Sequence, residues 1–566
     1  MKIEKLVIKK FRAINSCSLE VGQICAIVGQ NGSGKSSVLR ALNCFFNLDH
    51  EIDNFVSGSH SYSSSATSEI AIWFSDVPTE LSNYSDNNGM VGIRMRYKKR
   101  PAWSIRNLKD WEPAGDNLID IIDREVNYTY VPVDRSYEQA EWYEGGLLDL
   151  VVSEEIAKHV QRDRVTPKIK EAAEHLRARS LDPLAANLRN STLLAGDFNF
   201  SFEYSEDPDY RMLLNNLAIS VEENGKILPL SDTGSGTQSL TVFALYNYLS
   251  QINGKDYIIG FEEPEQNLHP QAQVNLIEEL RDSGLQVLFT THSPLIIDEL
   301  NHEEVALCRK SESNARAFET KVRQIPSSFF SDRGLDRDKY YKFHRRRNSE
   351  FFFSNFVAVF ESPIDVAVTE QIMEDSGVTL RRSGVNMVSV DGKSSMPYMY
   401  HLLRCLEIDC IAVVDKDYFF DFRNQKRADS LNSKGYPVYA EEWHLDGILD
   451  ASDIEATISE RLKNDLIHNH SASIEPLEKH DIYCFKTDME CDLVGCRDIR
   501  NNLAKIIGIS GVPDNDLEKT LLVDYKNAIK KQENLVPAVS GVSARSLPRT
   551  FQAIRRRLIG VANSYL

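Results

Sequence analysis

A glycine-rich turn carries the first residues whose types and spacing suit a chemical task. The run Gly29-Gln30-Asn31-Gly32-Ser33-Gly34-Lys35-Ser36 fits the pattern G-x-x-x-x-G-K-[ST], between an apolar strand predicted over 24–28 and a helix predicted over 36–46. Glycines let backbone N–H groups turn inward around phosphates, the lysine brings a positive charge, and the serine hydroxyl is a ligand for Mg²⁺. The residues expected to bind ATP at this turn are Gly29, Asn31, Gly32, Gly34, Lys35, Ser36 and Ser37.

Two carboxylates end a second apolar strand, predicted over 257–261. A buried strand brings Glu262 and Glu263 to the phosphate edge of a sheet. There we expect Glu262 to hold Mg²⁺ and Glu263 to orient or deprotonate the attacking water. The alternative is a solvated acidic turn, which the glycine-rich turn upstream makes the weaker interpretation.

A second group of acids follows two later strands. Glu361 ends the first of these, with Asp365 four residues on, and Asp415 and Asp417 follow the other. In a parallel sheet such strand ends lie side by side, and clustered carboxylates repel one another unless Mg²⁺ or Mn²⁺ neutralises them. Lys393 follows a strand between them and would neutralise a phosphate. The predicted catalytic residues are Glu263, Glu361, Lys393, Asp415 and Asp417; the predicted metal ligands are Ser36, Glu262, Glu361, Asp365, Asp415 and Asp417.

Alternating strand and helix patterns position these groups and predict an α/β fold with parallel sheets. The predicted strands cover 2–9, 24–28, 68–74, 199–204, 226–230, 257–261, 286–290, 357–360, 387–390 and 411–414. The predicted helices cover 36–46, 238–251, 271–282, 364–375 and 396–406, with an interrupted helical stretch over 151–190.

The chain has 566 residues, which is too long for one core, and the charged run 332–350 marks a junction. The predicted organisation is an ATPase head over 1–335, a junction over 336–354, a second α/β domain over 355–510 and a basic helical segment over 511–566. Within the head we expect a lobe over 1–80 that carries the glycine-rich turn, or P-loop, and an insertion at about 140–195. A further lobe over 196–330 carries the signature-like run 234–238 and the strand-end acids Glu262 and Glu263, which correspond to a Walker B motif.

Composition excludes several classes of protein. The net charge of -18 argues against a chain whose whole surface coats nucleic acid. The nine cysteines form no CxxC pair, which favours reduced thiols in a cytoplasmic protein. The chain has no apolar signal region at its start and no apolar run of the length that spans a membrane.

Two more motifs resemble parts of ABC ATPases. Gly234-Ser235-Gly236-Thr237-Gln238 is similar to the ABC signature, which meets the γ-phosphate held by a second subunit. His292, in Thr290-Thr291-His292-Ser293-Pro294, resembles the switch histidine that senses this phosphate. The resemblance adds Ser235, Gly236, Gln238, Glu262 and His292 to the expected nucleotide contacts.

The order of these motifs resembles the RecF- and SMC-like branch of ABC ATPases. The run Glu262-Glu263-Pro264-Glu265-Gln266-Asn267-Leu268-His269-Pro270 is similar to the OLD (overcoming lysogenisation defect) family, whose members join such a head to a Toprim domain. The resemblance implies a homodimer or higher homo-oligomer, with ATP between two heads and the insertion helping subunits associate. Tyr130 to Arg135 resembles a further element of these heads, and Arg135 is a candidate for the nucleotide or metal site.

The later acids resemble a Toprim domain, with a Glu after the first strand and a D-x-D after a later one. The implied two-metal mechanism assigns one ion to Glu361 and Asp365, and the other to Asp415 and Asp417. Ser362-Pro363 replaces the usual glycine, and Asp365 replaces a usual Glu, which leaves activity open. Glu442, Glu490 and Asp492 are further candidates, and surface charge is the alternative for each.

Basic residues gather near the C-terminus and at 344–347, where contact with DNA phosphates competes with the interpretation as a solvated helix face. No base-reading motif is evident, so we expect either little sequence specificity or specificity that comes from a partner. The predicted nucleic-acid contacts are Arg545, Arg549, Arg555, Arg556 and Arg557.

The resemblance implies a metal-dependent DNA endonuclease whose Toprim site is gated by ATP, in anti-phage defence. Family members act with a second protein, as in Gabija systems, or are restrained by the nucleic acid of a retron, and the residues do not choose between these partners. One alternative is an ATP-driven DNA clamp or repair-type ATPase with a non-catalytic Toprim domain. Topoisomerases and primases share Toprim chemistry but need further domains whose place the head occupies.

Overall fold

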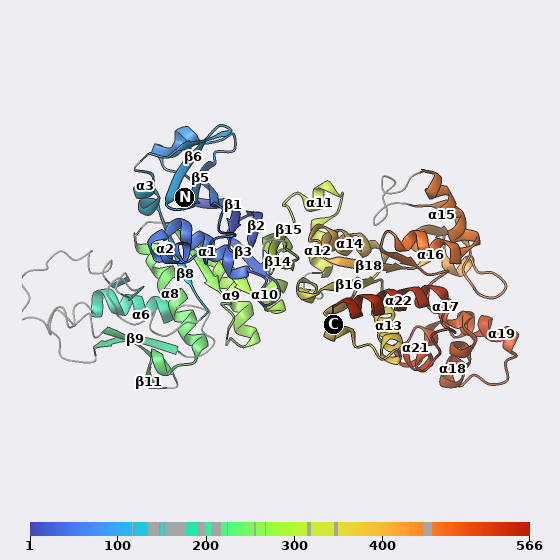
Figure 1. Cartoon of the computed structure of the whole chain (residues 1–566). Helices are drawn as coiled ribbons and strands as arrows, with labels where there is room; N and C mark the ends of the chain where they lie inside the picture. Colours follow the sequence, from blue (N-terminus) through green and yellow to red (C-terminus); the bar gives the residue numbers. More distant parts are fainter. Residues whose placement is uncertain are drawn as a thin grey trace, which may run out of the picture. The chain divides into compact units, whose positions relative to one another are not determined.

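The chain forms two compact units, Met1–Ser327 and Ser328–Leu566 (Figure 1). The computed structural model describes residues 1–115, 117–133, 147–148, 151–152, 177–189, 198–204, 217–223, 225–253, 256–266, 268–313, 318–344, 349–444 and 456–565. Most of the predicted insertion, Arg135 and the arginines of the 344–347 cluster lie outside these residues.

One large sheet organises the first unit. Twelve strands of its described part pair in the order β7-β6-β5-β4-β1-β2-β15-β14-β3-β13-β12-β8. They are β1 (Lys2–Phe11), β2 (Ile14–Glu20), β3 (Ile24–Val28), β4 (Ser68–Ser75), β5 (Val91–Tyr97), β6 (Pro101–Asn107), β7 (Asp110–Pro113), β8 (Val126–Val131), β12 (Asp256–Glu262), β13 (Gln286–Thr291), β14 (Val305–Ser311) and β15 (Glu319–Gln324).

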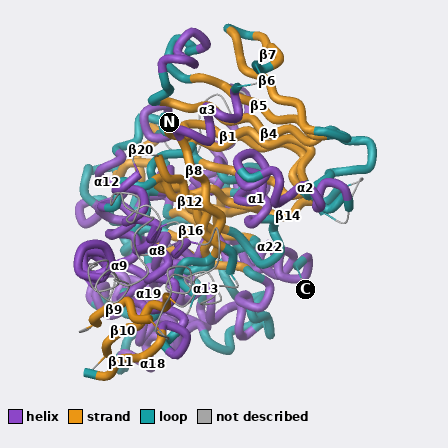
Figure 2. Tube along the Cα trace, turned by 90° about the vertical axis from the view of Figure 1, so that its left-hand side faces the viewer, coloured by secondary structure: helices purple, strands orange, loops and turns teal. Residues whose placement is uncertain are grey.

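The sheet has a parallel part and an antiparallel part. β14, β3, β13, β12 and β8 pair in parallel. All five residues of β3 are buried, which is typical of a parallel strand covered on both faces. From β2 through β1, β4, β5 and β6 to β7 every pair is antiparallel, and Figure 2 shows β5, β6 and β7 at one end of the sheet.

Helices and a smaller sheet complete the first unit. Its described helices are α1 (Lys35–Phe46), α2 (Leu48–Val56), α3 (Leu118–Glu125), α6 (Asp182–Arg189), α8 (Ser235–Asn253), α9 (Pro270–Asp282) and α10 (Pro294–Asp298). The small sheet joins β11 (Lys226–Pro229), β10 (Leu217–Glu223) and β9 (Phe198–Tyr204). α1 begins directly after the glycine-rich turn and buries Val38, Leu39 and Leu42, so the turn is fixed between a core strand and a core helix.

The second unit is built on a parallel sheet, as the sequence predicts. β17 (Val385–Ser389), β16 (Phe356–Phe360), β18 (Asp409–Val414) and β21 (Ile482–Cys484) pair in this order, and β19 (Phe420–Phe422) with β20 (Tyr439–Trp443) forms a small hairpin. Its described helices are α11 (Phe329–Asp332), α12 (Arg337–His344), α13 (Pro363–Asp375), α14 (Met396–Cys405), α15 (Ala456–His468), α16 (His470–Glu478), α17 (Met489–Gly495), α18 (Arg497–Ile507), α19 (Asp514–Lys519), α20 (Lys526–Ile529), α21 (Gln532–Val539) and α22 (Arg549–Ser564).

One core joins the Toprim-like strands to the last helices of the chain. Phe356 and Ile411 belong to the same cluster of buried side chains as Phe551 and Leu558 of α22. The predicted junction 336–354 also contributes fully buried rings, Tyr340 on α12 and Phe351 after it. Aromatic residues stand there in place of aliphatic ones, and for this reason the hydrophobic pattern of the junction was not evident.

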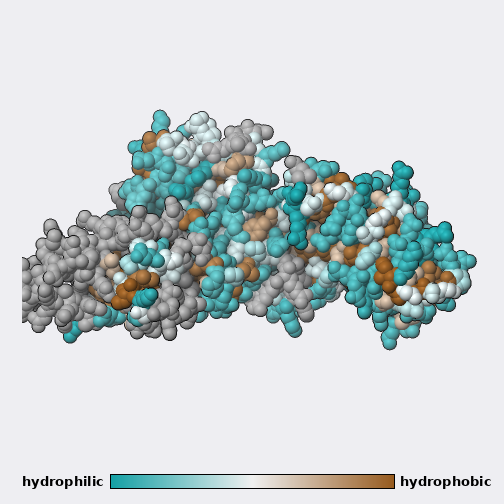
Figure 3. Space-filling view, turned by 90° about the horizontal axis from the view of Figure 1, so that it is seen from below, coloured by the Kyte–Doolittle hydropathy of each residue, from teal (hydrophilic) through white to brown (hydrophobic). Residues whose placement is uncertain are grey.

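The surface and the thiols set limits on this chain. Among the described residues, none of the helices combines the length and the apolar character that a bilayer crossing demands. The face in Figure 3 is mostly hydrophilic, with small separate hydrophobic patches. All nine cysteines are free thiols; Cys405 and Cys496 are half-buried and the other seven are buried.

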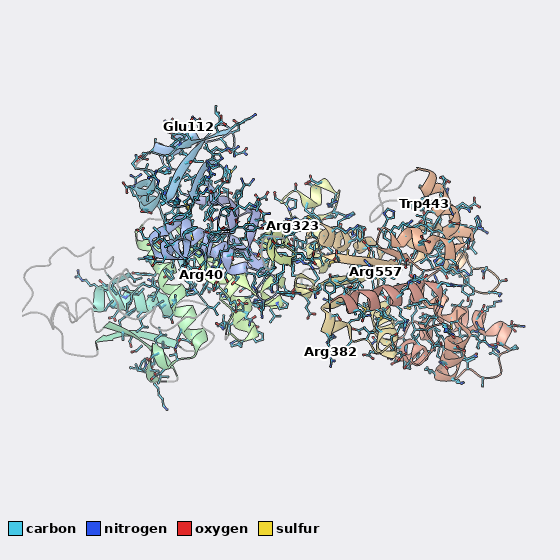
Figure 4. All side chains as sticks on the ribbon, in the orientation of Figure 1. Arg40, Glu112, Arg323, Arg382, Trp443 and Arg557 are labelled. Atoms are coloured by element: carbon cyan, nitrogen blue, oxygen red, sulfur yellow. The ribbon has the colours of Figure 1, made fainter. Side chains whose placement is uncertain are left out.

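A buried ionic network supports the helix that follows the P-loop. Glu51 on α2 is 3% exposed and accepts hydrogen bonds from His60 Nε2 at 2.7 Å, Asn43 Nδ2 at 2.7 Å and Asn54 Nδ2 at 2.8 Å. Arg40 of α1, labelled in Figure 4, lies 3.4 Å from the same carboxylate. Cys44 also approaches Glu51 and His60, but these donors already satisfy the carboxylate, so we interpret the group as structural.

Glu51→Gln is expected to lower the free energy of unfolding by about 2 kcal/mol, because it removes the charge of a buried carboxylate that accepts three hydrogen bonds and lies beside Arg40. Burial alone raises the pKa of Glu51, but hydrogen bonds from His60, Asn43 and Asn54 bring it down to about 2, below its ordinary 4.5. The ionised carboxylate therefore stabilises the fold above pH 4.5, and this contribution disappears as the pH falls toward 2. Tm measured from pH 7 to pH 2 should show the gap between wild type and variant narrowing.

Glu80→Gln is the matched control, since Glu80 and its partner Arg124 are both about half exposed, at 49% and 55%. We expect its Tm to equal that of the wild type. Equal Tm values for Glu51→Gln and Glu80→Gln at pH 7 would show that the network does not stabilise the first unit.

Candidate nucleotide site and acidic centre

The glycine-rich turn has a backbone that side chains would obstruct. Gly29, Gly32 and Gly34 all have positive φ values, of 142°, 69° and 97°. A Cβ at position 29 would overlap the carbonyl oxygen of Cys308, and a Cβ at position 34 would overlap the Thr320 side chain. The turn therefore needs glycine at these positions, as a phosphate-wrapping loop does.

A cavity of about 570 Å³ lies over this turn. Lys35 Nζ donates to the carbonyl oxygens of Gly29 and Gln30, at 3.2 Å each, and burial lowers the pKa of its ammonium group. Eight of the residues predicted for this site line the cavity: Asn31, Gly32, Gly34, Lys35, Ser36, Ser37, Glu263 and His292. Arg12, Ser59 and Phe318 line it as well. They were not predicted, because no sequence motif marks them.

The two Walker B acids have different surroundings. Glu262 ends β12 and is 7% exposed. Burial of Tyr130, together with the nearby Glu262 carboxylate, raises the pKa of Tyr130. Glu263 follows with φ of 45°, a backbone conformation uncommon outside glycine, and its N–H donates to Thr290 O at 3.0 Å. Backbone strain of this kind is frequent at functional sites, and here the hydrogen bond to Thr290 at the end of β13 stabilises the strained conformation.

His292 lies beside the Glu263 carboxylate. Its Nε2 atom is 3.6 Å from Glu263 Oε1, and its backbone N–H donates to Glu265 Oε1 at 2.9 Å. Burial and the nearby Lys35 lower the pKa of His292, so the imidazole is neutral near pH 7. Lys35, Glu263 and His292 therefore face one cavity, with a charge pattern suited to a triphosphate and a water.

The signature-like turn is placed differently. Ser235 and Gly236 start α8, and no residue of this helix is among the described residues that line the cavity. The Gln238 side chain is buried and donates to the carbonyl oxygens of Leu230 and Thr233, at 3.2 and 3.1 Å. Gln238 thus fixes the turn, and its predicted nucleotide contact stays a prediction.

In the second unit three predicted acids converge at one sheet edge. β16 and β18 are parallel neighbours, so Glu361 and Asp415 leave the sheet side by side. The Asp415 N–H donates to Glu361 Oε1 at 2.9 Å, and carboxylate oxygens of Glu361, Asp415 and Asp417 all lie within 4.8 Å of one another. This grouping differs from the predicted pairing, which divided the three between two ions.

Burial and mutual repulsion make Glu361 and Asp415 hard to ionise. Burial, with Asp417 and Asp365 nearby, raises the pKa of Glu361 to about 7. The pKa of Asp415 is raised further by burial and by Glu361. All three side chains offer oxygen atoms, the ligands that Mg²⁺ and Mn²⁺ prefer, so the donor set fits a divalent cation. Lys393 lies at the rim, with Nζ 2.8 Å from the Asp417 carbonyl oxygen and 3.4 Å from its carboxylate.

The unusual Ser362-Pro363 pair has a local explanation. Ser362 is the N-cap of α13 and accepts from the Asp365 N–H, while the Asp365 carboxylate accepts from the Ser362 N–H at 3.0 Å. Pro363 occupies the first helical turn, where its missing N–H has no consequence. Ser362 has an extended backbone, so the strand-to-helix turn forms without glycine.

Asp365 and Glu490 lie close to each other and next to the cluster of Glu361, Asp415 and Asp417. Burial raises the pKa of Asp365 to about 7, with a contribution from Glu490. Lys530 lies 3.3 Å from Glu490, and Asp488 pairs with Arg427 at 2.6 Å. Neither Asp488 nor the pairing of Lys530 with Glu490 was predicted from the sequence.

The other two candidate acids are not placed as ligands. Asp492 is committed to the turn before α17, because it accepts from the backbone N–H groups of Lys486 and Thr487 and from the Thr487 hydroxyl. Glu442 is exposed on β20.

Acids partly neutralise the C-terminal arginines. Arg556 and Arg557 on α22 pair with Glu478 and Asp481, both at 3.3 Å, and Arg555 donates to the Ser376 hydroxyl at 2.6 Å. Arg545 and Arg549 are exposed. DNA contact by these five residues stays a prediction.

Comparison with protein families matches both units. Residues 24–298 match a family model described as "AAA domain, putative AbiEii toxin, Type IV TA system". Residues 352–417 match the model "Overcoming lysogenization defect protein-like, TOPRIM domain".

Whole proteins of similar sequence align with most of this chain. An "OLD nuclease" of Thermus scotoductus is 23% identical, over 73% of this chain and 82% of that protein. An "Endonuclease GajA" of Bacillus cereus is 20% identical, over 85% of this chain and 94% of that protein. A solved Smc head bound to the C-terminal winged-helix domain of ScpA aligns with 58% of this chain and 99% of that one, at a TM-score of 0.43 and 16% identity.

Proposed function

Since the chain belongs to the OLD family of ATPases with a Toprim nuclease domain, we propose that it is an ATP-dependent, metal-dependent DNA endonuclease. The convergence of Glu361, Asp415 and Asp417 at one sheet edge carries the proposal. We take DNA as the substrate because the Thermus scotoductus relative is named an OLD nuclease and the Bacillus cereus relative an endonuclease.

Within this proposal divalent cations bind at the acidic centre, which consists of Glu361, Asp365, Asp415, Asp417 and Glu490. Glu361, Asp415 and Asp417 hold one ion, and Asp365 with Glu490 lies where a second would be held. A bound Mg²⁺ or Mn²⁺ supplies a more acidic water and stabilises a leaving oxygen. Lys393 places its ammonium group at the rim, where it offsets the charge of a phosphodiester.

The ATP site gates this centre. Lys35 and the turn bind the phosphates, Ser36 and Glu262 hold Mg²⁺, and Glu263 beside the neutral His292 orients the attacking water. Ser235 and Gly236 complete the site of a second copy, which makes the working form a homodimer or higher homo-oligomer. The similarity to GajA favours a Gabija-type role in anti-phage defence, with a second protein, over a retron.

Plasmid cleavage tests the proposal. Purified protein with Mg²⁺ or Mn²⁺ should convert supercoiled plasmid to nicked and linear forms, and EDTA should stop the reaction. Reactions with and without ATP give the direction of its control.

An intact plasmid in every metal and nucleotide, with ATP still hydrolysed, would contradict the endonuclease. That result would favour the alternative of an ATP-driven DNA clamp with a non-catalytic Toprim domain.

A further inference from the structure

We propose that the open face of the antiparallel strands in the ATPase unit is a docking surface for the backbone of duplex DNA. This basic sheet face is separate from the nucleotide cavity and the acidic centre, and its ligand rests on the proposed function. The face carries Lys5, Lys9, Glu69, Trp73, Arg94, Arg96, Arg106 and Trp111.

Strand register puts these side chains on one face. Trp73 of β4 is opposite Lys5 of β1 and Gly92 of β5, while Arg106 of β6 is opposite Trp111 of β7. Directly opposed residues project to the same side of a sheet. The other side is core, since Ile72, Ile93 and Ile105 are buried there, and the basic sheet face therefore points outward.

Its charge is opposite to that of the whole chain. Five cations stand on the basic sheet face against two carboxylates. Glu20 of β2 is opposite Lys5 at the edge of the face. Glu69 lies 3.0 Å from Lys9 and 3.6 and 3.7 Å from Arg94 and Arg96. Residues 94–109 contain seven Lys or Arg and no Asp or Glu, in a chain of net charge -18. Glu112, labelled in Figure 4, is opposite Ile105 and so belongs to the other side.

Tryptophan rings hold the cations in place. The Arg94 guanidinium lies 4.3 Å from the Trp111 ring, and Lys5 and Arg106 lie 5.6 and 5.7 Å from the Trp73 ring. The two rings meet edge to face at 5.8 Å. Cation–π contacts of this kind preorganise a charged group and lower the entropy lost when it binds.

These contacts also indicate which polyanion fits. Both rings are half-buried under cations, so they are poor platforms for stacking single-stranded bases. Arg96 and Lys9 keep 48% and 50% of their side chains exposed and can neutralise phosphates of a duplex. Reading of base edges needs a helix or ribbon in a groove, which a flat sheet face does not supply, so binding is independent of sequence.

The double variant Lys9→Glu/Arg96→Glu tests the proposal. Binding of a labelled 30-base-pair duplex is measured by fluorescence anisotropy in EDTA, from 50 to 200 mM NaCl. We expect Kd to rise on the order of 10- to 100-fold, and the slope of log K against log salt to become shallower by about 1.8, or about 0.9 for each phosphate that the protein no longer neutralises. Lys226→Glu/Lys434→Glu makes the same charge change at exposed positions elsewhere and should bind like the wild type.

Wild-type ATP hydrolysis by both double variants shows that they are folded. An unchanged Kd and salt slope for Lys9→Glu/Arg96→Glu would overturn the proposal, and wild-type plasmid cleavage would in that case leave the endonuclease standing. Wild-type protein that binds duplex but cuts nothing would instead refute the endonuclease alone. Charge-dependent binding to phosphatidylserine vesicles but not to duplex would assign the basic sheet face to a lipid surface and overturn the DNA proposal.

Discussion

Asp415→Asn is expected to lower the rate of plasmid cleavage by at least about 10³-fold, because it removes a ligand of the acidic centre. Removing a residue that only supports a metal ligand typically costs about 10- to 100-fold, and removing a direct ligand costs more. The geometry should survive, since the amide oxygen of asparagine can still accept the Met489 N–H that Asp415 Oδ1 accepts at 3.1 Å. Cleavage is followed as the disappearance of supercoiled plasmid in Mg²⁺ and Mn²⁺.

Stability separates a chemical defect from a structural one. Asp415 is buried beside Glu361, so the neutral amide relieves repulsion and Tm without metal should equal or exceed that of the wild type. Added Mn²⁺ should raise Tm in the wild type and much less in the variant. Asp421→Asn is the control, because Asp421 is 71% exposed and outside the acidic centre. Cleavage by Asp415→Asn at the wild-type rate would mean that the acids do not hold the working metal.

Glu263→Gln should lower the rate of ATP hydrolysis by about 10²- to 10⁴-fold, the range typical of general acid–base catalysis. Glutamine keeps the size of the side chain, and the contacts of the backbone N–H with Thr290 do not depend on the carboxylate. ATP binding should therefore stay near the wild-type Kd. Phosphate release measures hydrolysis, and a fluorescent ATP analogue measures binding.

Glu278→Gln, an exposed change on α9 of the same unit, is the control and should hydrolyse ATP normally. A trapped ATP state also reveals the direction of gating, since cleavage by Glu263→Gln with ATP rises if bound ATP activates the nuclease and falls if it restrains it. Hydrolysis within about threefold of the wild type would remove Glu263 from the catalytic role.

The sequence was most informative where one short pattern carries both geometry and chemistry. The glycine-rich turn predicted β3, α1 and the cavity wall, because Gly29 and Gly34 leave no room for side chains. Strand-end acids in a parallel sheet predicted the meeting of Glu361 with Asp415, since neighbouring strands end at the same edge. Each inference needs only a local pattern and a general rule of strand geometry.

Residues contributed from far away were harder to predict. Asp488 follows β21, which has only three residues and no detectable period. Arg12 lines the nucleotide cavity from the turn between β1 and β2, and no motif marks it. The arginines of α22 were grouped by sequence, but their partners Glu478 and Asp481 lie about eighty positions earlier. The basic run 94–109 is evident in the sequence, but only strand register shows that its Arg94, Arg96 and Arg106 share a face with Lys5 and Trp73.

Because seven of the nine thiols are buried, few of the chain's own cysteines would react with a thiol-specific spectroscopic label. Burial raises the pKa of Cys17, Cys25 and Cys410 to about 12, so few thiolates are present near neutral pH to react with maleimides. Removing only Cys405 and Cys496 would leave inert thiols. A fluorophore attached to a cysteine introduced at the exposed Arg100, beside the basic sheet face, would then report on the ATPase unit alone during turnover.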